Sequence, residues 1–352
     1  MKAKNVVQSE QFGFLANHST SHAIQIIKND VTNGIKKKQS TSMVLLDIQK
    51  AFDCVWHTGL IYKMIKLGFS PNLIKVIHSY LKSREFIVNV ENSSSRPRKI
   101  KAGVPQGSIL GPILFLIYIH DIPKHPRTRF TIFADDTTIR STETNPDNAV
   151  RNVQEHLRLI EPYYFNWKIR VNALKSEHII FTNKRNTQDI TTLSFNNNNI
   201  QRKNIVKYLG VTLQSNMKFT THCSNVVQQA RGTISRLWSV IGPKSKLNSL
   251  NKITIYKLYT RSILTYDIQV WNDVSSSTLR KIQRLQNNAL RLAMGLRPHP
   301  VTHKQVTNGK VHEMARIETI KEFSDRLYVN FVNQCMNHDN YLIRELFTIS
   351  TS

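Results

Sequence analysis

Two adjacent carboxylates stand inside a strand-like stretch, and this pair constrains the possible fold more than any other feature of the sequence. The segment FADDTTI, residues 133–139, places Asp135 and Asp136 between the flanks RFTIFA and TTIRST. These flanks contain the β-branched and aromatic residues that suit a pleated, half-buried surface, so they predict a β-hairpin with an acidic tip. One interpretation is an ordinary Asp-containing turn. The other is a site for a divalent cation, which would offset the repulsion between the two side chains.

A third carboxylate ends the apolar run MVLLDI, residues 43–48, which predicts a buried strand. A charge there is costly to desolvate unless it is paired or binds a metal ion, which favours a metal-binding role for Asp47. If this strand and the acidic hairpin are neighbours in one sheet, Asp47, Asp135 and Asp136 meet at one edge. Three oxygen donors without a nearby His or Cys suit Mg²⁺ or Mn²⁺, and two such ions can support an in-line phosphoryl displacement. For Asp53 we expect instead a structural role as the cap of the next helix.

The charge balance indicates a polyanionic partner. The 352 residues include 49 Lys and Arg against 23 Asp and Glu, a net charge of +26, which favours nucleic acid first and an anionic membrane second. The most apolar stretch, ILGPILFLIYI, is too short to span a membrane and contains Gly111 and Pro112, and no signal peptide is visible at MKAKNVVQSE. Three widely spaced cysteines argue against a zinc ribbon or a disulfide framework and indicate a reducing compartment, cytosol or nucleus.

Hydrophobic periodicity and start signals predict mixed helices and strands along the chain. Helices are expected at residues 58–66 and 71–82, and a buried helix should follow the VPQGS loop. Strands are expected in REFIVNV, RKIKAGV, HIIFT and KYLGVTL. A long helix should start at Pro146 and be kinked or ended by Pro162. From Thr221 onward the pattern is helical and basic.

The segment GVPQGSILGP, residues 103–112, is a second candidate for ligand contact. Gln106 and Gly107 offer an amide and a bare backbone, which suit close approach by a flat or phosphorylated ligand. By itself this segment is equally well explained as a Gly/Pro loop before a helix.

The phrases LLDIQKAFDCVWH, AGVPQGSILGPILF and FADD, in this order, resemble the palm motifs of reverse transcriptases. The flanking phrases QFGFLANHST, NWKIRVNALKSEHIIF, KYLGVTL and YDIQVWNDVSSSTLRKIQRLQNNALR narrow the resemblance to jockey-like, LINE-type non-LTR retrotransposons. It covers nearly the whole chain. The implied fold is α+β, a right-hand polymerase palm of antiparallel sheet and helices with partial fingers and a helical thumb. The implied domains are partial fingers at 1–41, the palm with inserted fingers elements at 42–215, the thumb at 216–300 and a helical extension at 301–352.

The resemblance implies a metal site and a proton donor. Asp47 and Asp135 match the paired ligands of two Mg²⁺ ions, with Mn²⁺ as a possible substitute, and Asp136 matches the third carboxylate. The backbone carbonyl of Ile48 would complete the shell of one ion. Lys175 matches a lysine that protonates the departing pyrophosphate, although a solvated surface role is the default for a lone lysine.

The resemblance also implies contacts with the substrate. Phe52 matches an aromatic gate whose ring collides with a ribose 2′-OH and so selects deoxynucleotides, with simple core packing as the alternative. Gln106 and Gly107 match the contact to the incoming nucleotide and template, and KYLGVTL resembles the primer grip. The implied partners are an RNA template, a DNA primer and deoxynucleoside triphosphates, and the oligomeric state is left open.

The implied function is RNA-directed DNA synthesis, and two rival functions are considered. An RNA-dependent RNA polymerase shares the palm carboxylates but is disfavoured by Phe52 and by Ala134, where a Gly is usual. The other rival is a catalytically inactive remnant that only binds nucleic acid. It is favoured by the short stretch of ten residues that precedes QFGF, too few for complete fingers, and by Leu15 where a basic residue is usual. We therefore expect the carboxy-terminal part of a longer polyprotein, or a decayed copy of one.

Overall fold

The computed structural model describes residues 6–184, 190–296 and 305–347. The chain forms two compact units, Met1–Asn204 and Ile205–Ser352. The outermost residues of the expected fingers and of the carboxy-terminal extension lie outside the described residues. The expected palm extends to residue 215, whereas the first unit ends at Asn204. The hairpin that follows contacts helix α6 (Thr220–Arg236) and therefore belongs to the second unit.

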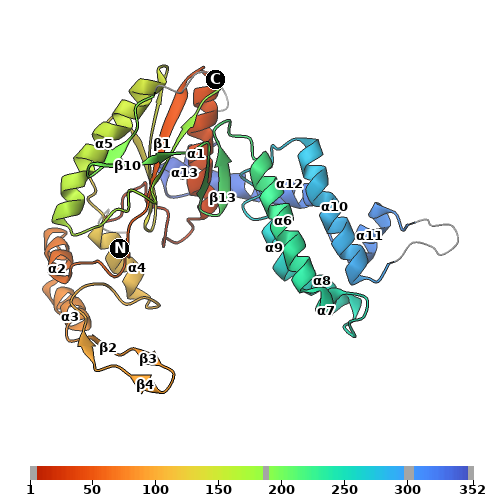
Figure 1. The fold of residues 1–352 in the computed structure, drawn as a ribbon, viewed down its shortest axis with the longest axis horizontal. Coiled ribbons are helices and arrows are strands. Elements are labelled where there is room, and N and C mark those ends of the chain that lie inside the picture. The colour runs from red at the N-terminus through yellow and green to blue at the C-terminus, as the bar shows by residue number, and fades with distance from the viewer. Residues whose placement is uncertain (1–5, 185–189, 297–304, 348–352) are drawn as a thin grey trace. The chain divides into compact units, whose positions relative to one another are not determined.

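A five-stranded sheet forms the centre of the first unit (Figure 1). Its strand order is β11-β8-β1-β7-β6, and only the pair β11–β8 is parallel. These strands are β1 (Ser40–Leu46), β6 (Arg129–Phe133), β7 (Asp136–Glu143), β8 (Glu177–Phe181) and β11 (Gln201–Arg202). The expected α+β palm, an antiparallel sheet with helices, is confirmed.

Helices cover both faces of this sheet. Neighbouring side chains of a strand point to opposite faces, so adjacent positions of β1 and β7 show which helix lies on each face. The register pairs Val44 with Ile139, and both belong to the apolar core that includes the long helix α5 (Pro146–Asn166). The adjacent position pairs Met43 with Arg140. The buried Arg140 side chain extends to Asp30 of helix α1 (Thr20–Lys36), with Nε 2.6 Å from Oδ2. Helices α5 and α1 therefore lie on opposite faces.

The remaining helices of the first unit confirm most of the sequence predictions. They are α2 (His57–Lys66), α3 (Pro71–Leu81) and α4 (Leu110–Tyr118). Pro162 was expected to kink or end α5, and of these alternatives the end is wrong, because the helix continues to Asn166. Pro162 lies close to the carboxy-terminal end, where a missing N–H removes only one of the last helical hydrogen bonds.

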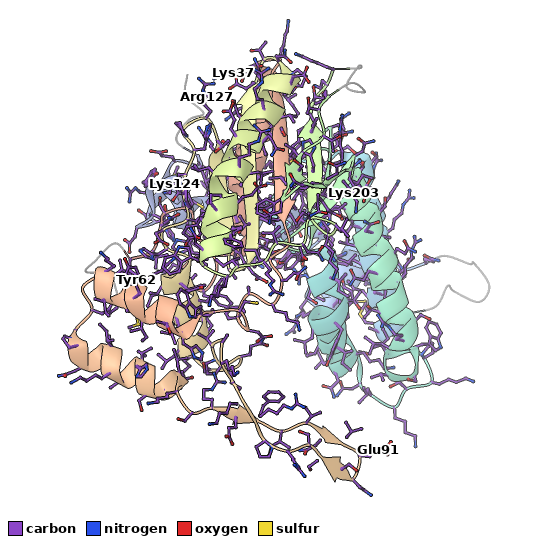
Figure 2. All side chains as sticks on the ribbon, turned by 60° about the vertical axis from the view of Figure 1, so that its left-hand side comes forward. Lys37, Tyr62, Glu91, Lys124, Arg127 and Lys203 are labelled. Atoms are coloured by element: carbon purple, nitrogen blue, oxygen red, sulfur yellow. The ribbon has the colours of Figure 1, made fainter. Side chains whose placement is uncertain are left out.

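A two-stranded ribbon projects from the first unit beyond α3 (Figure 1). The strands expected in REFIVNV and RKIKAGV are present only as short pairs, β2 (Glu85–Phe86) with β5 (Arg98–Lys99) and β3 (Asn89–Val90) with β4 (Ser93–Ser94). Glu91 lies at the tip (Figure 2), with φ +51 in the turn. All residues from 85 to 99 are exposed, so no packed surface extends the pairing. A further small hairpin joins β9 (Ser194–Phe195) to β10 (Asn198–Asn199).

The second unit begins with a hairpin of β12 (Ile205–Tyr208) and β13 (Val211–Gln214). The single strand expected in KYLGVTL is therefore wrong. Leu209 and Gly210 turn the chain with φ +44 and +86, and a Cβ on Gly210 would lie 2.8 Å from the Tyr266 ring. A glycine can adopt this backbone conformation and allow this close approach.

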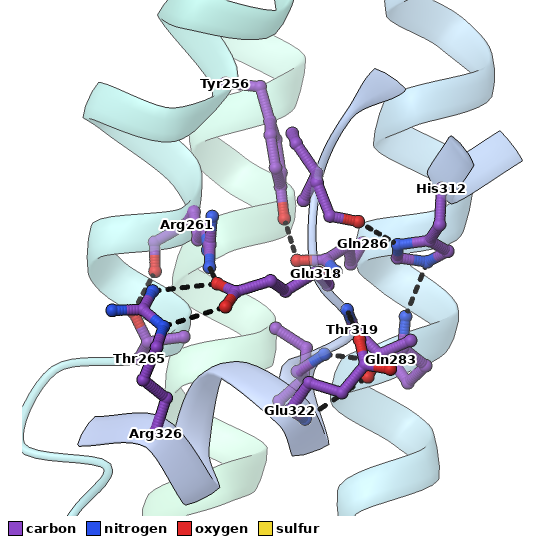
Figure 3. A network of polar contacts seen from close by, with 12 residues as sticks. Tyr256, Arg261, Thr265, Gln283, Gln286, His312, Glu318, Thr319, Glu322 and Arg326 are labelled. Atoms are coloured by element: carbon purple, nitrogen blue, oxygen red, sulfur yellow. Dashed lines mark hydrogen bonds and ion pairs between the residues drawn. The ribbon is translucent and has the colours of Figure 1, made fainter. Parts of the chain in front are cut away.

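Most of the remaining described residues of the second unit are helical, as the sequence predicts. The helices are α6, α7 (Trp238–Ile241), α8 (Ser249–Ile255), the π-helix η2 (Tyr256–Arg261), α9 (Ser262–Leu264), α10 (Ser276–Ala293), α11 (Asn308–Ala315), α12 (Ile320–Met336) and α13 (Tyr341–Arg344). Glu318 joins several of them (Figure 3): its carboxylate accepts two hydrogen bonds of 2.8 Å from Arg326 and pairs with Arg261 at 3.3 Å. Its carbonyl accepts a 2.8 Å bond from Gln286. Within the described ranges, no helix is long and apolar enough to cross a membrane.

Candidate active site

The sheet register brings the three predicted carboxylates to one edge. Leu46, the last residue of β1, pairs with Thr137 of β7, so the next position along the same register places Asp47 opposite Asp136. The pairing of Phe133 with Asp136 leaves Ala134 and Asp135 as the turn between β6 and β7. The predicted acidic hairpin tip is confirmed. Asp47 and Asp136 are exposed and Asp135 is half-buried, so all three can face a ligand at the surface.

The acidic turn is held by the QFGF segment, residues 11–14, a contact that sequence reasoning missed. The Gln11 side chain is buried, and its Oε1 accepts hydrogen bonds from the backbone N–H of Gly13 (2.8 Å) and Ala134 (3.1 Å). Phe12 also donates to the carbonyl of Ile132 at 2.8 Å. These bonds fix Ala134 in the left-handed region, at φ +61, where a non-glycine residue is held only by its surroundings.

Asp47 is anchored on its other side by the loop that carries Lys175. Its backbone N–H donates to Ser176 Oγ at 3.1 Å, and its carbonyl accepts from the Asn172 N–H at 2.8 Å. Lys175 follows in the same loop, where its N–H donates to the Asn172 carbonyl at 3.1 Å and its side chain is exposed. Lys175 therefore lies in the loop whose residues Asn172 and Ser176 bond to the backbone of Asp47.

The Ile48 carbonyl points away from this loop. Asp47 and Gln49 make the hydrogen bonds to residues 172 and 170, and Ile48 lies between them opposite Val171 as a non-bonded pair. In an antiparallel ladder the polar groups of such a residue point to the opposite side. The side chain of Ile48 is buried, with 7% of its surface exposed, so only its backbone can contribute to the site.

Electrostatics link the three carboxylates. Desolvation by the surrounding chain and the charges of Asp135 and Asp47 raise the pKa of Asp136 to about 6. Like charges that share a site favour the protonated form of one of them, and a hard cation would favour the ionised form instead. The residues therefore fit a divalent metal ion by donor type and by charge. In the described part of the chain, however, no three His, Cys, Asp or Glu side chains are already arranged as a metal-binding group.

Phe52 is half-buried among other aromatic rings. Its ring centroid lies 4.9 Å from that of Phe115 and 5.7 Å from that of Phe14, which meets it edge-on. The surrounding chain therefore fixes the orientation of the ring. Packing against Phe115 and a gating role are compatible, because Phe52 itself is only half-buried.

The loop before α4 is attached to the turn that carries Phe52. Val104 N–H donates to the Phe52 carbonyl and Gly103 N–H to the Val55 carbonyl, both at 2.8 Å. A Cβ on Gly103 would lie 2.8 Å from the Cα of Asp53, and its φ of +92 also favours glycine. These contacts hold the two loops together as one unit.

Gln106 extends this attachment through its side chain. Gln106 Nε2 donates to Asp53 Oδ1 at 2.9 Å. The expected capping role of Asp53 is wrong, because helix α2 begins at His57 and its N-cap is Trp56. Asp53 belongs instead to a turn, in which its N–H donates to the Lys50 carbonyl. Gly107 has φ +82, and a Cβ at this position would meet no atom of the described residues within 4 Å. Its bare backbone therefore faces open space.

The chain is similar in sequence to reverse transcriptases of mobile elements. The family model for "Reverse transcriptase (RNA-dependent DNA polymerase)" matches residues 1–213. The RNA-directed DNA polymerase from mobile element jockey of Drosophila melanogaster is 34% identical over 348 residues, 96% of this chain and 37% of that protein. The probable RNA-directed DNA polymerase from transposon X-element of the same organism is 28% identical over 351 residues, 98% of this chain and 38% of that protein.

The chain thus spans less than two fifths of the length of these relatives. Among solved structures, telomerase from Candida albicans, in complex with a fragment of telomeric RNA, is similar with a TM-score of 0.49 and 11% sequence identity. That similarity covers 88% of this chain and 56% of the telomerase chain.

Proposed function

Because the chain belongs to the reverse transcriptase (RNA-dependent DNA polymerase) family, we propose that it copies an RNA template by adding deoxynucleotides to a primer 3′-OH. The observation that carries this proposal is the meeting of Asp47, Asp135 and Asp136 at one edge of the sheet. In the reaction the primer 3′-OH gives up its proton to water, and its oxygen attacks the α-phosphorus of a deoxynucleoside triphosphate. The bond between the α-phosphorus and the oxygen that bridges it to the β-phosphate breaks, and pyrophosphate leaves.

The carboxylates of Asp47, Asp135 and Asp136, with the carbonyl of Ile48, would hold two Mg²⁺ ions, for which Mn²⁺ can substitute. When bound, such ions stabilise charge on the attacking and leaving oxygens. The carboxylates fit this role because desolvation and the charges of Asp135 and Asp47 raise the pKa of Asp136, and a bound cation would offset both effects. Lys175 would supply a proton to the departing pyrophosphate from the loop that anchors Asp47.

Substrate selection would depend on the two attached loops. The ring of Phe52, fixed by Phe115, would exclude a ribose 2′-OH by steric collision. Gln106 and the open backbone at Gly107 would contact the incoming nucleotide and the template. Asp53 would act as a positioning residue, because its carboxylate limits the orientations available to the Gln106 amide.

The second unit offers a groove that suits a nucleic-acid backbone. It has a volume of about 680 Å³ and lies between α6 and α10. Its walls carry Arg231 from α6 and Lys281 and Arg284 from α10. We propose that these cations contact phosphates of the RNA–DNA duplex, which would give affinity without sequence preference and with strong salt dependence.

Primer extension on poly(rA)/oligo(dT) tests the proposal. We expect the wild-type chain to add dTMP in the presence of Mg²⁺ and Asp135→Asn to add none. Both proteins should bind the duplex with the same salt-sensitive affinity and unfold at the same urea concentration. Asp147→Asn, the same change in the first turn of α5, is the matched control and should keep wild-type extension. Duplex binding without extension by the wild-type chain would instead support the inactive nucleic-acid-binding alternative.

A further inference from the structure

An aromatic pocket on the first unit lies outside the proposed active site. It has a volume of about 400 Å³ and is lined by Trp56, Thr58, Gly59, Tyr62, Asn166 and Trp167. Trp56 ends the loop that carries Phe52, whereas the other lining residues belong to α2 and to the carboxy-terminal end of α5, and none of them belongs to the carboxylate edge. Tyr62 lies on α2 (Figure 2), and 51% of its surface is exposed. Its ring centroid lies 6.3 Å from that of Trp167, with 35° between the ring planes.

The residues at the base of the pocket are closely packed. A Cβ on Gly59 would lie 2.5 Å from a ring carbon of Trp56 and 3.1 Å from one of Trp167. A side chain at this position would therefore displace both indoles, and glycine lets them lie directly against α2. The pocket is thus a built feature of the fold rather than a gap between loosely placed surface side chains.

A buried lysine packs against Trp167, one of the aromatic residues that line the pocket. Lys63 is 1% exposed, and its Nζ lies 3.7 Å from the Trp167 ring centroid. The same ammonium donates to the Tyr118 carbonyl at 2.5 Å and to the Tyr163 hydroxyl at 2.8 Å, and it pairs with Asp121. These contacts fix the orientation of the Trp167 ring, so a flat ligand would meet an aromatic surface that needs no reordering.

Two exposed lysines add positive charge beside the rings. Lys66 Nζ lies 5.6 Å from the Tyr62 ring centroid, and Lys168 Nζ lies 4.2 Å from that of Trp56. Lys168 follows the end of α5 with φ +56, in the left-handed conformation that glycine usually provides there.

The chemistry of the pocket distinguishes between possible ligands. Apolar aromatic walls suit a flat π-system, and adjacent ammonium groups suit a phosphate attached to it. Proteins that bind single-stranded nucleic acid combine these two elements, stacking aromatic rings on bases beside a positively charged path for the backbone. The net charge of +26 makes a basic peptide a poor match.

We propose that the aromatic pocket binds an unpaired nucleobase of a single-stranded nucleic acid by stacking, with Lys66 and Lys168 next to the flanking phosphates. The site would act independently of primer extension. It would hold a single-stranded segment of RNA or DNA whether or not the carboxylates are functional.

Fluorescence anisotropy of labelled oligo(dT) and oligo(rU) on the full chain tests this site. Tyr62→Ala should weaken binding about 5- to 150-fold, the range expected for loss of one stacked base. Tyr259→Ala removes an equally exposed tyrosine, 57% accessible, from η2 and should leave affinity unchanged. Comparison of the two oligomers shows whether RNA or DNA is the preferred strand.

An oligonucleotide of abasic sites separates stacking from charge. It should bind wild type and Tyr62→Ala equally, because it has phosphates but no base to stack. Lys168→Gln should weaken binding of both kinds of oligonucleotide at low salt. Equal affinity of wild type and Tyr62→Ala for oligo(dT) and oligo(rU) would overturn the proposal. So would an equal loss of affinity for the abasic oligonucleotide, because the tyrosine would then act without a base.

Discussion

Removing the Asp53 carboxylate should weaken nucleotide binding only while Gln106 is present. Gln106 Nε2 donates to Asp53 Oδ1 at 2.9 Å on an exposed surface. Without this acceptor the amide gains rotational freedom, which must be lost again when a nucleotide binds. Immobilising one such side chain costs about 0.5–1.5 kcal/mol, and 1.36 kcal/mol corresponds to a tenfold change. We therefore expect Asp53→Ala to raise KM for the deoxynucleotide about 2- to 12-fold with little change in kcat.

A double-mutant cycle in single-nucleotide extension isolates this effect. Asp53→Ala, Gln106→Ala and the double variant are compared with wild type at saturating primer–template. In the Gln106→Ala background, Asp53→Ala should cause no further rise in KM. Asp53→Asn keeps an oxygen acceptor and should remain within about 2-fold of wild type, because the hydrogen bond is retained. The Asp147→Ala variant controls for loss of one negative charge.

Additive effects of the two alanine substitutions would refute the reasoning, because Asp53 would then act without Gln106. A fall in kcat with unchanged KM would refute it as well, since the carboxylate would then influence the chemical step. If the wild-type chain extends no primer, the same cycle is measured by urea unfolding. A coupling of zero between the two positions there would show that the hydrogen bond does not form in solution.

Three further variants test other parts of the site. Phe52→Val should raise incorporation of ribonucleotides relative to deoxynucleotides, and an unchanged ratio in an active enzyme would leave Phe52 with a packing role alone. Gly13→Ala should lower the free energy of unfolding by about 1–3 kcal/mol in urea, because its Cβ would lie 2.3 Å from the Ala134 nitrogen; an unchanged unfolding midpoint would contradict the tight contact. Burial lowers the pKa of His178 to about 3, so the unfolded chain takes up a proton that the folded chain does not, and stability should fall as pH falls from about 6.5 toward 3. His178→Gln should flatten that dependence, and an unchanged slope would show that another group causes it.

The carboxylate edge was predictable because its signals are local. An apolar run that ends in an acid predicts a buried strand with a charge at its exit, and β-branched flanks around FADD predict a hairpin. Both patterns lie within a few residues of Asp47 and Asp135. The sequence predicted that these carboxylates meet only if the two strands are neighbours, and the pairing of β1 with β7 fulfils that condition.

The contacts that position the loops were not predictable from local patterns. Gln11 reaches Ala134 across 123 positions, and Gln106 reaches Asp53 across 53. An Asp a few positions before a helix is typical of an N-cap. In the structure, however, Asp53 forms a turn with Lys50, and α2 begins only at His57, so Asp53 cannot cap it. Likewise, the β-branched residues of KYLGVTL suit a strand, and one glycine among them decides for a hairpin.

The register of β1 against β7 is therefore as much a part of the proposed active site as the carboxylates. A slip of one residue would turn every side chain of β1 to the other face of the sheet. Val44 would then leave the apolar core that it shares with Ile139, and Asp47 would no longer lie opposite Asp136. Arg140 adds to this constraint on β7, because its buried guanidinium needs Asp30 of α1 on its own face. Residues that never touch a nucleotide thus determine which way Asp47 points.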